Sequence, residues 1–460
     1  MYKKTRALLT NFSLLLVAFG FALLLSEVMV RVFFPPLPTV NIFSAENMKL
    51  FYVFDPLLGW RKKPNHRGVV TSAFNEFTVL EEFNSRGIRG PEYPYEKKQG
   101  EVRILVLGDS FTNGDMVPFE ELLTERLKVG LKNGGHKTYE VINAGTNGYS
   151  TDQELLYFQH EGRKYSPDLT VVMFYYNDIW WNIQPKYRVG HKPLFRVKES
   201  KLLLTNVPLP PPDGKLLLTN VPDPSTSEWT FLRRLKHLLT QKSMLYLLVR
   251  DRVKSSFDLY TLAVALHLAE RPIADEIRPP GQGQAVKREL PLLGYIPEEF
   301  KVFETSYDSE VLQAWDLTEA ILRELKTATA SVGSRLLVFY IPSKASIYSE
   351  SWAATKRRYG IKNDDGWDIE RPGLVLKSIC KRNDIDYIDP TEVFKREAEK
   401  LRSEGKKLYF DIDNHWNSLG HKLAGEVLLK HVLTDLNSQV YATGRDSRIS
   451  RNSSGNLPLR

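Results

Sequence analysis

The chain has 460 residues, of which 42% are hydrophobic and 26% are charged, as in an ordinary globular protein. Its net charge of +8 is small for this length, and the sequence has no long run of lysine and arginine, so a nucleic-acid-binding surface is not indicated. The single cysteine, Cys380, excludes an internal disulfide and a cysteine-rich metal site.

The N-terminal segment indicates where the protein resides. Residues 7–25 carry no charge and, as a helix, would extend ~28 Å, close to the hydrocarbon thickness of a bilayer. Lys3, Lys4 and Arg6 precede this stretch, so the positive-inside rule places the N-terminus in the cytoplasm. A cleaved signal peptide is the alternative, but no small-x-small cleavage motif follows the apolar stretch. We predict a single-pass anchor over residues 1–34 in the inner or plasma membrane, with the remainder extracytoplasmic.

Residues 35–100 form a lead-in segment. The segment opens with Pro-Pro-Leu-Pro at residues 35–38, which is a stiff exit from the membrane. Turn sequences at residues 55–56 and 84–87 then separate short β-like runs, and no long helical period is present. We expect this segment to pack on the main domain.

From residue 101 to residue 182, strand-like and helix-like stretches alternate. Three apolar runs are typical of strands and two amphipathic stretches of helices: 103–108, 139–145 and 168–178 for the strands, and 118–135 and 151–165 for the helices. Thr151, with Glu154 three residues later, predicts a capping box for the second helix. The apolar runs do not alternate with polar residues, which indicates a parallel sheet covered on both faces.

Residues 183–305 interrupt this pattern, because they are rich in proline and irregular. They contain the octapeptide KLLLTNVP twice, at 201–208 and 215–222. We predict that the two copies form β-strands joined by the Pro-Pro-Pro-Asp-Gly turn between them. The whole stretch, including a helix near 231–254, is assigned to an insertion that caps the core.

The alternating pattern resumes over residues 306–436, which we take as the second half of the same α/β domain. The predicted elements are a long helix over 308–333, a strand at 334–343, a helix at 373–383, a short strand at 386–390, a helix over 391–405 and a final helix. The tail at 437–460 is rich in Ser, Arg, Asn and Gly and is predicted to be disordered.

Three candidate site residues fall at the carboxyl ends of three consecutive predicted strands. Ser110 follows the first strand, Gly148 lies in the loop after the second, and Asn177 follows the third. In an open parallel sheet these ends lie side by side, where ligands bind. Each residue alone has an ordinary explanation, as a helix cap, a positive-φ glycine or a turn. Their convergence favours a site.

A serine nucleophile requires a base, and His415 is the candidate. It lies in DIDNHWNSLGH, between the last predicted strand and the final helix, with Asp411 and Asp413 close by. A carboxylate on one ring nitrogen fixes the tautomer, so that the other nitrogen can take the serine proton. The other histidines that we considered suit packing, capping or solvated positions: His136, His160 and His421.

Gly108-Asp109-Ser110, Gly148, Asn177 and His415 resemble, in this order, the four sequence blocks of the SGNH (GDSL-type) hydrolase superfamily. The resemblance covers roughly residues 103–433, interrupted by the insertion. It implies a flavodoxin-like three-layer α/β/α sandwich with Ser110 as nucleophile and His415 as base. It also implies an oxyanion hole formed by the backbone N–H groups of Ser110 and Gly148 and by the side-chain amide of Asn177.

The third triad member departs from the usual Asp-x-x-His spacing of that superfamily, because Ile412 stands three residues before His415. The Asp-x-His-Trp arrangement at residues 413–416 is similar to that of SGNH-like proteins of alginate and related exopolysaccharide O-acetylation. We therefore assign Asp413 to the triad, with Asp411 as the substitute. Supporting roles are assigned to Asp109, Asp178 and Asp411.

The resemblance and the predicted location together indicate a membrane-anchored serine esterase acting on O-acyl groups of cell-envelope or exported polysaccharide. One alternative is a polysaccharide O-acetyltransferase with the same triad, which would need a membrane-bound O-acyltransferase partner. Another is a non-catalytic carbohydrate-binding assembly protein. Aromatic residues beside the site suit sugar rings, with packing as the alternative for each: Trp416, Tyr175, Trp180 and Trp181. We expect no cofactor and no nucleic-acid partner.

The same residues allow two other kinds of site. An α/β-hydrolase elbow requires Gly-x-Ser-x-Gly, and Thr112 stands at the second glycine position. A metal site is conceivable, because carboxylate and imidazole suit several divalent ions. It would leave the three residues after the strands unexplained, so no metal is predicted. Its ligands would be Asp411, Asp413, His415 and His421.

Overall fold

The computed structural model describes residues 2–33, 39–41, 51–72, 76–134, 138–187, 190–199, 201–209, 296–362 and 365–434, with positions 243, 245, 246 and 249. Outside these residues lie the second octapeptide copy, most of the helix predicted near 231–254, and the tail at 437–460.

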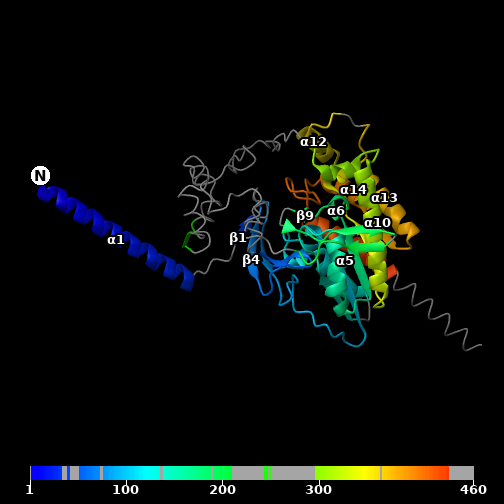
Figure 1. Cartoon of the computed structure of the whole chain (residues 1–460), viewed down its shortest axis with the longest axis horizontal. Helices are drawn as coiled ribbons and strands as arrows, with labels where there is room; N and C mark the ends of the chain where they lie inside the picture. Colours follow the sequence, from blue (N-terminus) through cyan, green and yellow to red (C-terminus); the bar gives the residue numbers. More distant parts are fainter. Residues whose placement is uncertain are drawn as a thin grey trace, which may run out of the picture.

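A five-stranded parallel sheet forms the centre of the domain, which Figure 1 shows on the right of the view. Its strands are β6 (Glu101–Gly108), β7 (Thr138–Asn143), β8 (Leu169–Phe174), β13 (Arg335–Tyr340) and β14 (Asp386–Ile388). They lie in the order β14-β13-β8-β6-β7, and every neighbouring pair is parallel. Counted along the chain, this is the flavodoxin-like order 2-1-3-4-5, in which the topological switch point falls between β6 and β8. The predicted fold class is confirmed.

The central strands are apolar because both faces of the sheet are covered. Every residue of β8 is buried, and Val102 is the one residue of β6 that is not. Parallel strands buried on both faces read as continuous hydrophobic runs rather than alternating ones. This is the pattern from which the sheet was predicted.

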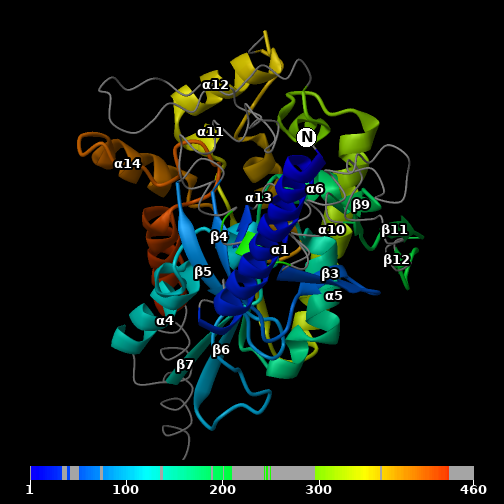
Figure 2. The same ribbon diagram turned by 90° about the vertical axis from the view of Figure 1, so that its left-hand side faces the viewer.

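Helices form the two outer layers. In Figure 2, α4 (Leu123–Gly134), α14 (Thr391–Arg402) and the final helix at 418–434 lie on one side of the sheet. On the other side lie α5 (Thr151–His160) and α10 (Ser309–Ala330). Arg382, the last residue of α13 (Arg371–Arg382), donates from Nε to the Glu319 carboxylate of α10 at 2.7 Å.

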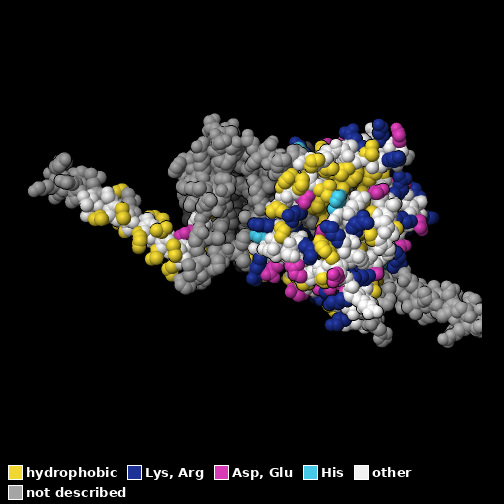
Figure 3. Space-filling model, turned by 60° about the horizontal axis from the view of Figure 1, so that its bottom comes forward, with side chains coloured by type: hydrophobic (Ala, Val, Ile, Leu, Met, Phe, Trp, Pro, Cys, Tyr) yellow, Lys and Arg dark blue, Asp and Glu magenta, His cyan; other side chains and the backbone are white. Residues whose placement is uncertain are grey.

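An apolar helix, α1 (Tyr2–Phe33), precedes the domain. Its segment Thr10–Val30 has a mean hydropathy of 2.3 and is long enough to cross a membrane. Large apolar side chains of this helix are exposed, including Phe12, Val17 and Phe21. Figure 3 shows hydrophobic side chains, in yellow, on the surface of this helix. Such a helix at an N-terminus fits either a membrane span or a signal sequence.

The lead-in segment forms short strands that belong to two small sheets of their own. They are β1 (Thr39–Asn41), β2 (Tyr52–Asp55), β3 (Gly59–Lys62), β4 (Arg67–Thr71) and β5 (Thr78–Glu82). The Trp60 indole of β3 donates to the Asn147 carbonyl at 2.9 Å, and the Tyr149 hydroxyl donates to the Trp60 carbonyl at 2.6 Å. The lead-in segment therefore lies against the loop that follows β7.

The first octapeptide copy supplies β12 (Lys201–Leu204), which pairs antiparallel with the preceding strand β11 (Phe195–Lys198). The predicted pairing of this copy with the second one lies outside the described residues, because residues 215–222 are not among them. The predicted capping box is wrong: Ser150 is the N-cap residue of α5, and the Thr151 hydroxyl accepts a hydrogen bond from the Asn182 amide at 2.6 Å.

Candidate active site

Ser110 is presented by a tight strand-to-helix turn at the end of β6. The short helix α3 (Ser110–Asn113) follows after Asp109, whose carboxylate accepts a hydrogen bond from the Phe111 N–H at 2.9 Å. The turn starts at Gly108, which has φ +154°, and a Cβ there would meet the Thr112 hydroxyl at 2.0 Å. A glycine is therefore required where the strand ends, and Ser110 starts the helix beside the switch point.

The structure brings three of the predicted site residues into one hydrogen-bonded chain. Ser110 Oγ lies 2.7 Å from His415 Nε2, although the residues are 305 positions apart in sequence. His415 Nδ1 lies 2.5 Å from Asp413 Oδ1, and the His415 backbone N–H donates to the same oxygen at 2.8 Å. The Asp413 side chain is 4% exposed and that of His415 is 25% exposed, so the imidazole is the more accessible of the two.

The electrostatics of this chain favour an ionised carboxylate beside a basic imidazole. Burial raises the pKa of Asp413, but the His415 charge and hydrogen bonds outweigh it and hold the pKa below its ordinary value. Burial lowers the pKa of His415, but Asp413, Asp109 and Asp115 outweigh it and raise the pKa above its ordinary value. With Asp413 ionised, the imidazole proton belongs on Nδ1, and Nε2 can accept the Ser110 proton.

The other two predicted oxyanion residues follow β7 and β8, the strands that border β6 on either side. The loop after β7 is tied to the nucleophile turn by the Thr146 N–H, which donates to the Gly108 carbonyl at 2.9 Å. Gly148 in this loop has φ +75°, and its backbone lies against the ring of Tyr187. Asn177 begins α6 (Asn177–Asn182) directly after β8, and its Oδ1 is buried without a hydrogen-bond partner among the described residues.

The carboxylates assigned to supporting roles lie in different surroundings. Asp109 and Asp178 are buried, whereas the Asp411 side chain is 75% exposed and pairs with Lys407 at 2.6 Å. Burial raises the pKa of Asp109 to about 6, against the lowering effect of the His415 charge. The structure contradicts Asp411 as a substitute for Asp413, because Asp411 faces solvent and Lys407 rather than the imidazole.

Glu154 is a further buried carboxyl group close to Asp109 and Asp178, and the sequence alone did not identify it as one. Both of its carboxyl oxygens are buried without a hydrogen-bond partner among the described residues. Burial raises the pKa of Glu154 and of Asp178 well above its ordinary value, and nearby carboxylates raise each further. The neutral, protonated form of each carboxyl group is therefore favoured over the charged form. The sequence placed Glu154 in a capping motif, which points to a solvated helix end.

Three of the four predicted sugar-stacking aromatics are packed inside the protein, whereas Trp181 is half-buried. Trp416 is fully buried, with its ring 5.1 Å from that of Phe111 and 5.3 Å from that of Phe394. Tyr175 and Trp180 are each 7% exposed. Their ring faces are therefore not available to a substrate, and the packing alternative is correct for these three residues.

A buried lysine from the lead-in segment joins the nucleophile turn to the loop after β7. Lys62 Nζ donates to Asn113 Oδ1 at 3.1 Å and to the Gly145 carbonyl at 2.6 Å. Burial lowers the pKa of Lys62 to about 7, although the charge of Glu81 opposes this shift. The sequence offered one signal for it, because the period of two in a strand places Lys62 on the same face as Trp60.

His421 is a packing residue. It is buried, its Nδ1 lies 3.3 Å from the backbone N–H of Leu123, and burial lowers its pKa to about 3. His421 is therefore neutral at physiological pH. Among the described residues, no group of three or more His, Cys, Asp or Glu side chains is placed to hold a metal ion.

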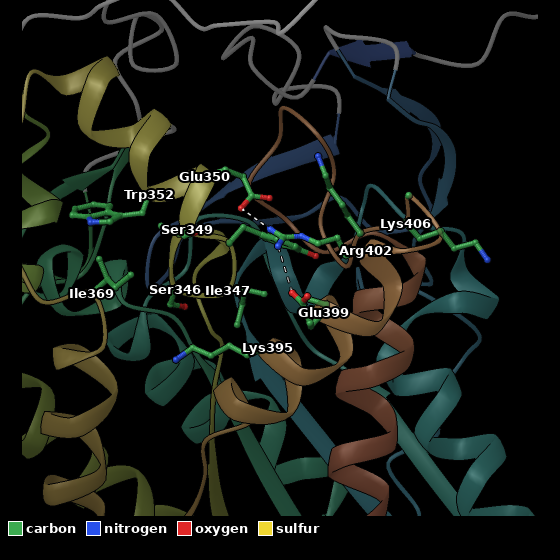
Figure 4. A pocket seen from close by; sticks show the side chains of 15 residues that line it. Ser346, Ile347, Ser349, Glu350, Trp352, Ile369, Lys395, Glu399, Arg402 and Lys406 are labelled. Carbon is green, nitrogen blue, oxygen red and sulfur yellow. Dashed lines mark hydrogen bonds and ion pairs between the residues drawn. The ribbon is translucent and has the colours of Figure 1, made fainter. Parts of the chain in front are cut away.

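A separate pocket of about 440 Å³ lies between α11 (Lys344–Ile347), α12 (Ser349–Tyr359) and α14. In Figure 4, Arg402 lies between Glu350 and Glu399, at 3.5 and 3.6 Å from their carboxylates. The residues that line the pocket include Lys407 but none of the Ser110, His415 and Asp413 chain. Its position does not support a role in the chemistry of that chain.

No family model matches the chain, and no curated protein matches it. Several solved structures do. A catalytic mutant of an acetylxylan esterase from Geobacillus stearothermophilus is 12% identical, with 73% of this chain and 95% of that chain covered and a TM-score of 0.34. The acetyl xylan esterase AlAXEase is 13% identical, with 72% of this chain and 100% of that chain covered and a TM-score of 0.35. A lipase/acylhydrolase from Enterococcus faecalis is 12% identical, with 72% of this chain and 95% of that chain covered and a TM-score of 0.32. Because these identities and TM-scores are low, only the site geometry carries the function proposed below.

Proposed function

We propose that this chain is a serine esterase of the SGNH type that works through an acyl-serine intermediate. The observation that carries the proposal is the hydrogen-bonded chain from Ser110 through His415 to Asp413, with distances of 2.7 and 2.5 Å. A serine hydroxyl is activated by a base within hydrogen-bonding reach when a carboxylate orients that base. The position beside the switch point of a parallel sheet supports the same conclusion.

In the proposed reaction, Ser110 Oγ attacks the ester carbonyl carbon while His415 Nε2 takes the hydroxyl proton. The Ser110 and Gly148 N–H groups and the Asn177 amide stabilise the negative charge on the carbonyl oxygen, at about 3–4 kcal/mol for each donor. The bond to the alcohol then breaks as His415 returns the proton to the leaving oxygen. Water attacks the acyl-serine in the same way, which releases the acid and regenerates Ser110.

The proposed substrates are O-acyl groups of cell-envelope or exported polysaccharide. This part rests on α1, which we propose as an uncleaved anchor with its N-terminus in the cytoplasm and the domain extracytoplasmic. The apolar segment Thr10–Val30 and the basic residues Lys3, Lys4 and Arg6 before it support that orientation. An anchored domain on that side of the membrane meets envelope glycans rather than cytoplasmic metabolites.

The test uses the full chain in detergent with p-nitrophenyl acetate. Ser110→Ala is expected to lower kcat by ~10⁴-fold or more. Ser403→Ala, at an exposed serine of the domain, is the matched control and should leave kcat unchanged. Equal activity of Ser110→Ala and the natural chain would contradict the proposal. Ser110-dependent transfer of the acetyl group to an oligosaccharide, in place of water, would instead make the protein an acyltransferase with this site.

A further inference from the structure

The carboxylate and the imidazole of the proposed triad come from one short loop, residues 410–416. Asn414 alone separates Asp413 from His415, and the Asp413 carboxylate binds both the ring and the backbone N–H of His415. The Phe410 N–H donates to the His415 carbonyl at 3.1 Å and closes the loop. The direction of the imidazole therefore depends on the backbone conformation of residues 411–413.

A carboxylate from the lead-in segment holds one side of this backbone. Glu76 accepts hydrogen bonds from two consecutive N–H groups, from Ile412 to Oε1 at 2.8 Å and from Asp413 to Oε2 at 3.0 Å. The ring of the adjacent Phe77 packs on the ring of Phe410 with centroids 5.1 Å apart. Glu76 is thus fixed against the start of the loop.

A lysine from the helix that follows β13 holds the other side of the backbone of residues 411–413. Lys344, the first residue of α11, donates from Nζ to the Asp411 carbonyl at 2.7 Å and to the Asp413 carbonyl at 3.3 Å. Burial lowers the pKa of Lys344 to about 8, although Glu76 opposes this shift, so the ammonium is charged near neutral pH. The Glu76 carboxylate therefore accepts hydrogen bonds from N–H groups of the loop, and the Lys344 ammonium donates hydrogen bonds to its carbonyl groups.

We infer that Glu76 is a positioning residue for the proposed triad. Together with Lys344, it clamps residues 411–413 and keeps the Asp413 carboxylate against His415 Nδ1. The inference rests on the proposed function. It makes the lead-in segment part of the catalytic unit, because a residue between β4 and β5 sets the geometry of a base 339 positions later.

The test compares Glu76→Ala, Glu76→Gln and Lys344→Met in the full chain, with p-nitrophenyl acetate as the probe. Glu82→Gln is the matched control, because that carboxylate lies in the same segment and pairs at the surface with Arg67. Misplacing a catalytic group by about 1 Å costs ~100-fold in rate. We expect Glu76→Ala to lower kcat by about that factor with little change in KM, and Glu76→Gln, which keeps one acceptor, to lower it less.

The pH profile separates positioning from folding. The contact with Asp413 raises the His415 pKa, so a loosened contact should move the acidic midpoint of kcat/KM to lower pH in Glu76→Ala. If Glu76→Ala lowers Tm and activity but leaves the midpoint of the kcat/KM pH profile unchanged, Glu76 contributes to folding only and the inference is overturned. If Glu76→Ala does not fold, the midpoints of Glu76→Gln and Lys344→Met decide instead.

The two proposals fail in different ways. If the Glu76 and Lys344 variants keep the kcat and the pH midpoint of the unmutated protein while Ser110→Ala is inactive, the positioning role is overturned and the proposed esterase function is not. Full activity of Ser110→Ala would overturn the esterase itself.

Discussion

The ring of Tyr187 lies directly against the backbone of Gly148. A Cβ added to Gly148 would come within 2.4 Å of Tyr187 Cε1. The Tyr187 ring stacks in turn on Trp60, with centroids 5.8 Å apart and an interplanar angle of 22°. The loop after β7 is thus held between the lead-in segment and the chain that leaves β8.

This contact predicts that Gly148→Ala is damaging for two separable reasons. The positive φ costs an alanine about 1–2 kcal/mol, and the added methyl group also meets the Tyr187 ring. We expect lower kcat and lower Tm than in Gly366→Ala, where the added Cβ meets nothing within 4 Å. Adding Tyr187→Ala should recover only the steric part of the loss. Natural kcat and Tm in Gly148→Ala would contradict the proposed place of Gly148 in the site.

Asn177 should act only when charge develops on the substrate. Removing one oxyanion donor typically lowers kcat by about 10²–10³-fold, so we expect Asn177→Ala to lose kcat with an unchanged KM. Steady-state kinetics with p-nitrophenyl acetate measures this, with Asn133→Ala, at an exposed position of α4, as the matched control. A change confined to KM would mean that Asn177 binds the substrate but does not stabilise the transition state.

The pH dependence of the rate should reflect the carboxylates around His415. His415 must be neutral to take the Ser110 proton, so kcat/KM falls as the pH drops through its pKa. Because that pKa is raised, the midpoint should lie above the ordinary imidazole value of about 6.5. Asp115→Asn removes one raising charge and should shift the midpoint down. A midpoint below 6.5 in the natural chain, or no response to Asp115→Asn, would contradict this electrostatic description.

Glu154 should make the protein less stable as the pH rises. Its pKa is raised in the folded chain, so its stabilising contribution is complete below the unfolded-state value near 4.3 and is lost at higher pH. Between the two pKa values the loss is about 1.4 kcal/mol per pH unit for one proton. Glu154→Gln should therefore unfold at a higher denaturant concentration than the natural chain at pH 8, with a smaller difference at pH 4. An equal difference at both pH values would count against a raised pKa.

The sheet and the residues of the proposed triad can be predicted because their signals are local. Continuous apolar runs identify buried parallel strands, and parallel strands bring their carboxyl ends to one edge, which is where Ser110, Gly148 and Asn177 were expected. His415 could be chosen because polar residues follow the last strand and carboxylates lie beside it. Asp413 was preferred to Asp411 from a resemblance, and the backbone geometry of the loop gives the same choice.

The contacts made by the lead-in segment could not be predicted, because they depend on tertiary structure. Glu76 and Lys62 are ordinary polar residues in short β-like runs, and nothing local indicates that their partners lie in distant loops. Trp416, suggested as a sugar-stacking residue, is buried for the same reason. A position next to a site residue in sequence does not determine whether a ring faces a ligand or the core.

The most direct test of the central claim is covalent labelling of the full chain with a fluorophosphonate, followed by mass spectrometry of the peptides. An activated serine displaces fluoride from phosphorus and keeps the phosphonyl group. We predict one adduct per chain, on the peptide containing Ser110, and no adduct in the His415→Ala variant. Labelling on another residue, or equal labelling of Ser110 without His415, would contradict the claim that these two residues form a catalytic pair.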